Sequence, residues 1–245
     1  MIAALVLSAV ALAPDLRVEP LAEGVWLHVS SHEVDGVLVE ANGLVVEADG
    51  AAFLVDVTWT EAQAEALYEW ITGRGLVVEG AVVTHGHQDR GGGLPALQLH
   101  GVSSWSLPRT ADDLDTQGFG RPDRTFDPEK PKRLFEGRLE AVFPGKGHSR
   151  DNLVVWIPEQ GILFGGCLVR SAEATSIVET PGSVLSRWEK TVVAVETRFP
   201  DARTIVPGHG PPGGPELLRH TARLAHEALE ARREARRRAA EADGE

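Results

Sequence analysis

Six residues that can bind a metal ion each follow the end of a short apolar run. Three of them come directly after the run 81–84, and each of the other three follows a run of its own. Ligand sites in layered α/β folds gather at the carboxyl ends of strands, so we expect these four segments to converge. The six residues are His85, His87, Asp89, His148, Cys167 and His209.

The types and spacing of these residues favour zinc. Residues two apart on an extended segment face the same side, which places His85, His87 and Asp89 together. Imidazole, carboxylate and thiolate groups are zinc ligands, whereas Mg²⁺ and Ca²⁺ prefer shells made only of oxygen. Six ligands exceed the four of one structural zinc. They suit two zinc ions, each with three protein ligands and an open position for water, which is typical of catalytic sites.

The first third of the chain has the pattern of a β-meander followed by a helix. Apolar residues alternate through the segments 25–31 and 36–57, and Asp49-Gly50 between two apolar runs predicts a hairpin. The sequence TEAQ at 60–63 is a capping box that opens a helix, which we expect to end near Gly73 and Gly75. The run 81–84 then predicts a buried strand.

The second half repeats this order of strands followed by a helix. Strand-like segments at 139–143, 152–157 and 162–164 precede a helix over about 184–199, a short strand at 204–206 and a final helix from Pro215. This repetition predicts two sheets packed face to face with helices outside, in one α/β domain made of two similar halves.

Composition and charge narrow the function classes. The 245 residues are 42% hydrophobic and 24% charged, which is ordinary for a globular protein, and the formal net charge is −12. A surface this acidic argues against nucleic acid or an anionic membrane as a partner. We expect the partner to be a small-molecule substrate and the protein to be a monomer.

An unbroken apolar run at 2–13 predicts a signal peptide. It is too short to span a bilayer, and Ala11-Leu12-Ala13 fits a cleavage site. We therefore expect residues 1–13 to be removed, leaving a single domain at 14–245 in the periplasm or secreted. The alternatives are a mis-assigned start and a buried N-terminal strand.

Four motifs resemble those of the metallo-β-lactamases of subclass B1, over nearly all of the chain from Val18 to Leu224. They are THGHQDRGGG, PGKGHSRDNLVVWIP, ILFGGCLV and IVPGHG. The resemblance implies an αββα sandwich with two zinc ions, one on His85, His87 and His148 and the other on Asp89, Cys167 and His209. Cys167 is the discriminating residue, because most relatives in the wider superfamily carry Asp at that position.

The resemblance also implies roles for residues near the ligands. Arg170 falls where the family has a basic residue that binds the substrate carboxylate, and it is grouped with Asp89 and His148 as catalytic. Glu179 falls near the usual position of an Asn that polarises the lactam carbonyl. Its charge opposes an anionic substrate if it faces the groove.

Three further residues complete the expected site. We expect His32, in SSHEVDG, to lie on a mobile loop over the site and to contact substrate. We expect Arg90 and Asp56 to contact the metal ligands on the side away from the metal and to fix their orientation. For Asp56, an ordinary cap at the end of a strand is an equally good explanation.

The function implied is hydrolysis of the β-lactam amide bond of antibiotics by a zinc-bound hydroxide. Two alternatives remain at this point. The first is a zinc hydrolase of the same fold acting on lactones or thioesters, which the missing Asn and the charge of Glu179 favour. The second is a non-catalytic zinc-binding module.

Overall fold

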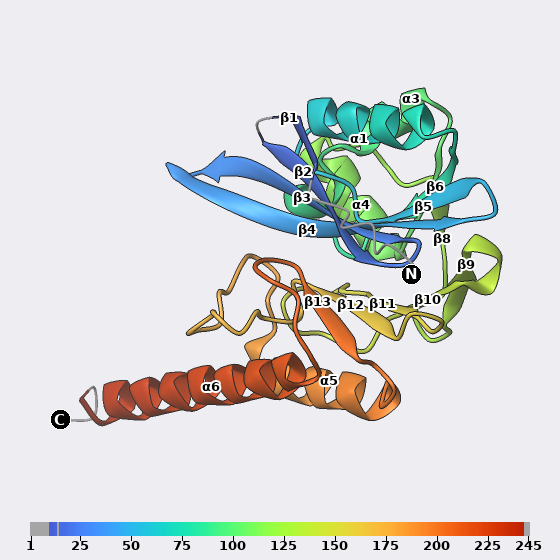
Figure 1. Cartoon of the computed structure of the whole chain (residues 1–245). Helices are drawn as coiled ribbons and strands as arrows, with labels where there is room; N and C mark the ends of the chain where they lie inside the picture. The colour runs from blue at the N-terminus through green and yellow to red at the C-terminus, as the bar shows by residue number, and fades with distance from the viewer. Residues whose placement is uncertain (1–9, 14, 243–245) are drawn as a thin grey trace.

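A computed structural model describes residues 10–13 and 15–242, which form four layers with the two sheets in the middle (Figure 1). The larger sheet has the strand order β1-β2-β3-β4-β5-β6-β7-β8. Its strands are β1 (Val10–Ala13), β2 (Leu16–Ala22), β3 (Val25–Val34), β4 (Val37–Ala48), β5 (Ala51–Val55), β6 (Val77–Val82), β7 (Ser103–Ser106) and β8 (Arg124–Thr125).

The smaller sheet has the order β13-β12-β11-β10-β9. Its strands are β9 (Lys132–Leu134), β10 (Leu139–Val142), β11 (Val154–Ile157), β12 (Ile162–Gly166) and β13 (Thr204–Pro207). The helices are α1 (Glu61–Gly73), α2 (Gln88–Gly91), α3 (Leu94–Leu99), α4 (Pro108–Gln117), α5 (Leu185–Arg198) and α6 (Glu216–Ala242), with a 3₁₀ turn η1 (Phe135–Gly137). The predicted α/β sandwich is therefore confirmed.

Three apolar clusters hold the layers together. The central cluster lies between the sheets and includes Val29, Phe53 and Phe164. A second cluster joins the outer face of the larger sheet to α1, α3 and α4, and a third joins the outer face of the smaller sheet to α5 and α6. Helices therefore cover both outer faces, as the strand-then-helix repetition predicts.

Local signals in the sequence explain the element boundaries. Thr60 and Gln63 form the reciprocal capping box at the start of α1. Asp49 and Gly50, both with positive φ, form the turn between β4 and β5. Both features confirm the predictions.

The segment SSHEVDG does not form the loop that we expected. It is part of a continuous hairpin in which His32 pairs with Val39 and Val34 pairs with Val37. The physical reason is a second Asp-Gly turn, because Asp35 and Gly36 both adopt positive φ and so match the twist of the flanking strands. The hairpin projects to the left in Figure 1.

The predicted leader is only partly covered. Residues 1–9 and 14 lie outside the described residues, and Val10–Ala13 pairs with β2 at the edge of the larger sheet. Among the described helices, none is both long and apolar enough to cross a membrane.

Candidate metal centre

The four ligand-bearing segments meet at one edge of the sandwich, where backbone hydrogen bonds join the two sheets. Leu153 N–H, beside the His148 loop, donates to the Thr84 carbonyl at the end of β6 (2.8 Å). Asn42 N–H in β4 donates to the Gly208 carbonyl after β13 (2.9 Å). These bonds bring segments that are far apart in the sequence to one place.

Three histidines form the first group of candidate ligands. His87 Nδ1 lies 3.0 Å from His85 Nε2 and 3.2 Å from His148 Nε2. Nitrogens bound to a tetrahedral zinc at about 2.0–2.1 Å lie about 3.3 Å from one another. His87 Nδ1 therefore lies from each of the other two rings at about the separation of two nitrogens bound to one tetrahedral zinc.

Asp89, Cys167 and His209 form the second group. Cys167 Sγ lies 3.4 Å from Asp89 Oδ2 and 3.3 Å from His209 Nε2, and those two atoms are 3.3 Å apart. Zinc bonds of about 2.3 Å to sulfur and 2.0–2.2 Å to nitrogen or oxygen give separations of about 3.3–3.6 Å. All six predicted ligands therefore lie close together, in overlapping groups of three whose donor atoms are within 4.8 Å of one another. One of these groups is the predicted set of Asp89, Cys167 and His209.

Burial favours the uncharged forms of the His148 imidazole and the Cys167 thiol. The pKa of His148 is lowered to about 3, chiefly by burial and also by the neighbouring His87, so the imidazole is neutral with a free lone pair. Burial also raises the pKa of Cys167 well above its usual range, against the effect of Arg90. A bound cation is therefore needed to hold the thiolate.

Arg90 is fully buried directly behind the second group. Its Nε and Nη2 bind Asp89 Oδ2 at 2.8 and 2.6 Å, and its Nη1 lies 3.2 Å from Asp56 Oδ2. The same guanidinium donates to the carbonyls of Asn42 (2.6 Å) and Gly208 (3.0 Å). Arg90 thus fixes the rotamer of Asp89 and ties it to both sheets.

Asp56 supports the same region from the end of β5. Its carboxylate accepts from the Thr84 N–H (2.7 Å) and hydroxyl (2.9 Å), so it both caps the β6 end and pairs with Arg90. Burial raises the pKa of Asp56 to about 6, and Arg90 acts against this shift.

Several residues that hold the ligand loops were not found from the sequence. Asn152 accepts from Ser149 N–H (2.8 Å), and Asp151 accepts from Gly86 N–H (2.9 Å). His209 Nδ1 lies 2.6 Å from the Glu40 carbonyl, which leaves Nε2 for a metal. Asp151 and Asn152 lie inside the motif around His148, which was the only available signal for them.

Arg170 lies beside the second group with its guanidinium only partly paired. Its backbone N–H donates to Thr221 Oγ1 of α6 (2.9 Å), while Nε is buried without a hydrogen-bond partner among the described residues. Burial lowers its pKa, and Cys167 acts in the opposite direction. A cation with free donors near the ligands is suited to an anionic ligand.

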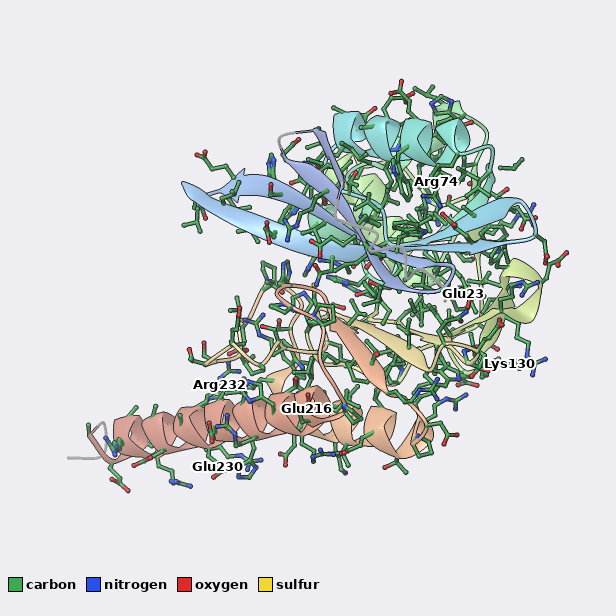
Figure 2. All side chains as sticks on the ribbon, viewed as in Figure 1. Glu23, Arg74, Lys130, Glu216, Glu230 and Arg232 are labelled. Atoms are coloured by element: carbon green, nitrogen blue, oxygen red, sulfur yellow. The ribbon has the colours of Figure 1, made fainter. Side chains whose placement is uncertain are left out.

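The other two predicted substrate contacts have protein partners. Glu179 forms an ion pair with Arg232 of α6, and the described residues contain no ion pair between Glu179 and Arg170. In Figure 2, Arg232 is labelled on the side of α6 that faces the sheets. The His32 ring lies against Trp59 with centroids 5.5 Å apart. The structure therefore joins the six ligands with Arg90, Asp56 and Arg170, whereas Glu179 is held by α6.

A cavity of about 600 Å³ opens beside the three-histidine group. One wall is His87 and Gly86, and the others come from α4, from the residues after His148 and from the loop before α5. Its volume is in the range of small-molecule sites.

An αββα sandwich with these two ligand sets at its edge defines a class of metal-dependent hydrolases, and the chain belongs to the metallo-beta-lactamase superfamily. The family model matches residues 37–209, which contain all six candidate ligands.

Two named relatives of this chain come from bacteria. The chain is 35% identical to metallo-beta-lactamase type 2 of Bacteroides fragilis over 94% of this chain and 93% of that protein. It is 32% identical to metallo-beta-lactamase type 2 of Pseudomonas aeruginosa over 85% and 83% of the two chains. Among solved structures, TMB-1 is 37% identical with a TM-score of 0.85, covering 89% of this chain and 100% of that one. DIM-1 metallo-beta-lactamase is 36% identical with a TM-score of 0.82, covering 88% and 99%.

Proposed function

We propose that this protein hydrolyses the amide bond of β-lactam antibiotics with two zinc ions. The observation that carries the proposal is the gathering of six metal-binding donors at one edge of the sandwich, with neighbouring donor atoms 3.0–3.4 Å apart, close to the separations in a tetrahedral zinc shell. The ligands are His85, His87 and His148 for one ion and Asp89, Cys167 and His209 for the other. The named relatives support β-lactams as the substrate class.

The zinc ions, when bound, supply an acidified water as nucleophile and positive charge that polarises the lactam carbonyl. The protein's own residues position the reactants. Arg170 binds the substrate carboxylate through its guanidinium and places the lactam nitrogen near the second ligand set. Arg90 holds the Asp89 carboxylate in one orientation. Burial of the ligand sets excludes bulk water from behind the reacting bond.

The ion pair between Glu179 and Arg232 weakens one of the two arguments for a lactone or thioester substrate. That argument was repulsion between Glu179 and an anionic substrate, but the ion pair with Arg232 already neutralises the carboxylate. The missing Asn still removes one donor to the carbonyl oxygen. β-Lactams therefore remain the better-supported substrate.

A hydrolysis panel tests the proposal. Nitrocefin, a homoserine lactone and a glutathione thioester are each assayed with zinc-loaded protein and with metal-depleted protein. We expect zinc-dependent hydrolysis of nitrocefin at a kcat/KM well above those of the other two. Preference for the lactone or thioester would replace the substrate assignment, and binding of zinc without any hydrolysis would indicate a non-catalytic module.

We further propose an exported, monomeric protein with one domain at 14–245. The apolar run at 2–13 and the bacterial relatives support export, and cleavage after Ala13 removes β1 and leaves β2 at the edge of the larger sheet. N-terminal sequencing of protein from a periplasmic fraction tests this, because a retained residue 1 would contradict it.

A further inference from the structure

A second cavity lies beside α5, the helix that covers the outer face of the smaller sheet (Figure 1). It measures about 550 Å³, which is in the range of small-molecule sites, and it shares no lining residue with the cavity beside His87. One wall is the segment 143–146, directly after β10. The other wall is a single face of α5, because its residues follow the helical spacing of three and four. They are Arg187, Lys190, Thr191 and Ala194.

Three cations line this cavity without an acidic partner. Lys146 comes from the segment after β10, and Arg187 and Lys190 come from α5. All three are exposed, and within residues 10–13 and 15–242 none of them forms an ion pair. The acidic residues Glu189 and Glu196 of α5 contact side chains of α6 instead. The cavity therefore holds an uncompensated positive charge in a chain whose formal net charge is −12.

The two cations on α5 are unfavourable for the helix itself. α5 begins at Leu185 with no acidic residue in its first turn and no side-chain cap. A cation near a helix N-terminus opposes the helix dipole, and like charges three residues apart repel each other. Arg187 and Lys190 therefore lower the stability of the protein without a bound anion, and an anion in the cavity offsets that cost.

We propose that this cavity binds a small organic anion that carries an apolar group. The three cations attract the anionic group, and Phe143, Pro144 and Ala194 provide contact surface for the apolar group. An extended polyanion is a poorer match, because the net negative charge of the chain repels it along its length. For a small anion that repulsion is screened beyond about 8–10 Å. The inference does not depend on the proposed hydrolysis.

An NMR titration of the full chain with three probes tests the ligand class. Naphthalene-2-carboxylate has a charge and an apolar ring, naphthalene-2-carboxamide lacks the charge, and acetate lacks the ring. The methyl group of Ala194 reports on the cavity. We expect the carboxylate to bind at least about threefold more tightly than either of the other probes, with an affinity that falls as the salt concentration rises. Equal affinity for the carboxamide or for acetate, or no shift with any probe, would overturn the inference.

Matched double variants assign the binding to this cavity. Arg187→Gln with Lys190→Gln should weaken binding of the carboxylate by about three- to thirtyfold, the effect of two exposed charge pairs. Arg236→Gln with Arg237→Gln removes the same charge from exposed positions of α6 and should leave binding unchanged. Without a probe, the α5 double variant should be at least as stable to urea as wild type, because it removes two unfavourable charges. Unchanged binding in the α5 double variant, or a clear loss of its stability, would overturn the inference.

Discussion

Replacing the buried His28 should remove a large part of the acid sensitivity of this fold. His28 lies in β3 with no exposed surface, and its ring covers Gly43 of β4 so closely that an added Cβ there would meet Nε2 at 2.2 Å. Neither ring nitrogen has a hydrogen-bond partner among the described residues. The pKa of His28 is lowered to about 3, chiefly because burial disfavours the charged ring; the Asp56 backbone opposes this shift and Arg90 adds to it.

The size of the effect follows from the difference between the folded and unfolded pKa values. The folded value is depressed to about 3 from an ordinary 6.5, so His28 stays neutral in the folded protein while the unfolded chain takes up a proton. The contribution of the neutral His28 to the free energy of unfolding is therefore complete above about pH 6.5 and is lost as the pH falls towards 3. At about pH 5 the loss is roughly 1.5 pH units multiplied by 1.36 kcal/mol, or about 2 kcal/mol.

Urea unfolding of metal-depleted protein at about pH 7.5 and about pH 5 measures this difference. His28→Phe keeps a ring without a titrating group, and His28→Leu serves as a second variant if the larger ring overpacks the site. Between about pH 7.5 and about pH 5, the free energy of unfolding should fall by about 2 kcal/mol more in wild type than in either variant. At about pH 7.5 the variants should be no less stable than wild type, because the substitution removes no side-chain hydrogen bond between described residues. Asp56 and Arg90 are present in all three proteins. Equal pH dependence in wild type and both variants would refute the buried, neutral His28.

Three further substitutions test the site. Cys167→Ser should selectively weaken the affinity of the second site for zinc, as measured by zinc titration. The loss should exceed the roughly 10- to 100-fold that follows from removing a residue that only supports a metal ligand. Two sites of wild-type affinity would make Cys167 a packing residue. Arg170→Ala should raise KM for anionic β-lactams by about 10- to 100-fold, which corresponds to the loss of a charge-assisted hydrogen bond. Arg170→Lys should retain most of the binding. An unchanged KM in the alanine variant would exclude the contact with the substrate carboxylate. Glu179→Asn and Arg232→Gln disrupt the same exposed ion pair. Each should therefore change KM by less than about fivefold and lower the free energy of unfolding by under about 1 kcal/mol. A larger fall in KM in Glu179→Asn would show that Glu179 faces the substrate.

The metal centre could be predicted from the sequence because its information is local. His85, His87 and Asp89 follow one strand at a spacing of two, and the other ligands each follow an apolar strand at a Gly break. Chain geometry then places them at strand ends, which meet at one edge of the sandwich. The capping box at Thr60 is local in the same way.

The parts that were missed depend on contacts between distant segments. Glu179 is 53 residues from Arg232, and only the packing of α6 against the loop before α5 shows that their charges cancel. The cavity beside His87 requires α4, a helix of mostly polar sequence that was not among the predicted elements. By contrast, the second Asp-Gly turn at Asp35 was a local signal, and applying the same rule there as at Asp49 predicts the long hairpin.

The most direct test of the central claim is zinc content measured together with hydrolysis on one preparation. Metal-depleted protein is titrated with zinc, and bound metal and nitrocefin turnover are followed at each addition. The two ligand sets predict saturation at about two zinc ions per chain, with hydrolysis abolished by exhaustive chelation and restored by zinc. Full hydrolysis after exhaustive chelation, or saturation at a single ion with both ligand sets intact, would contradict the dizinc site.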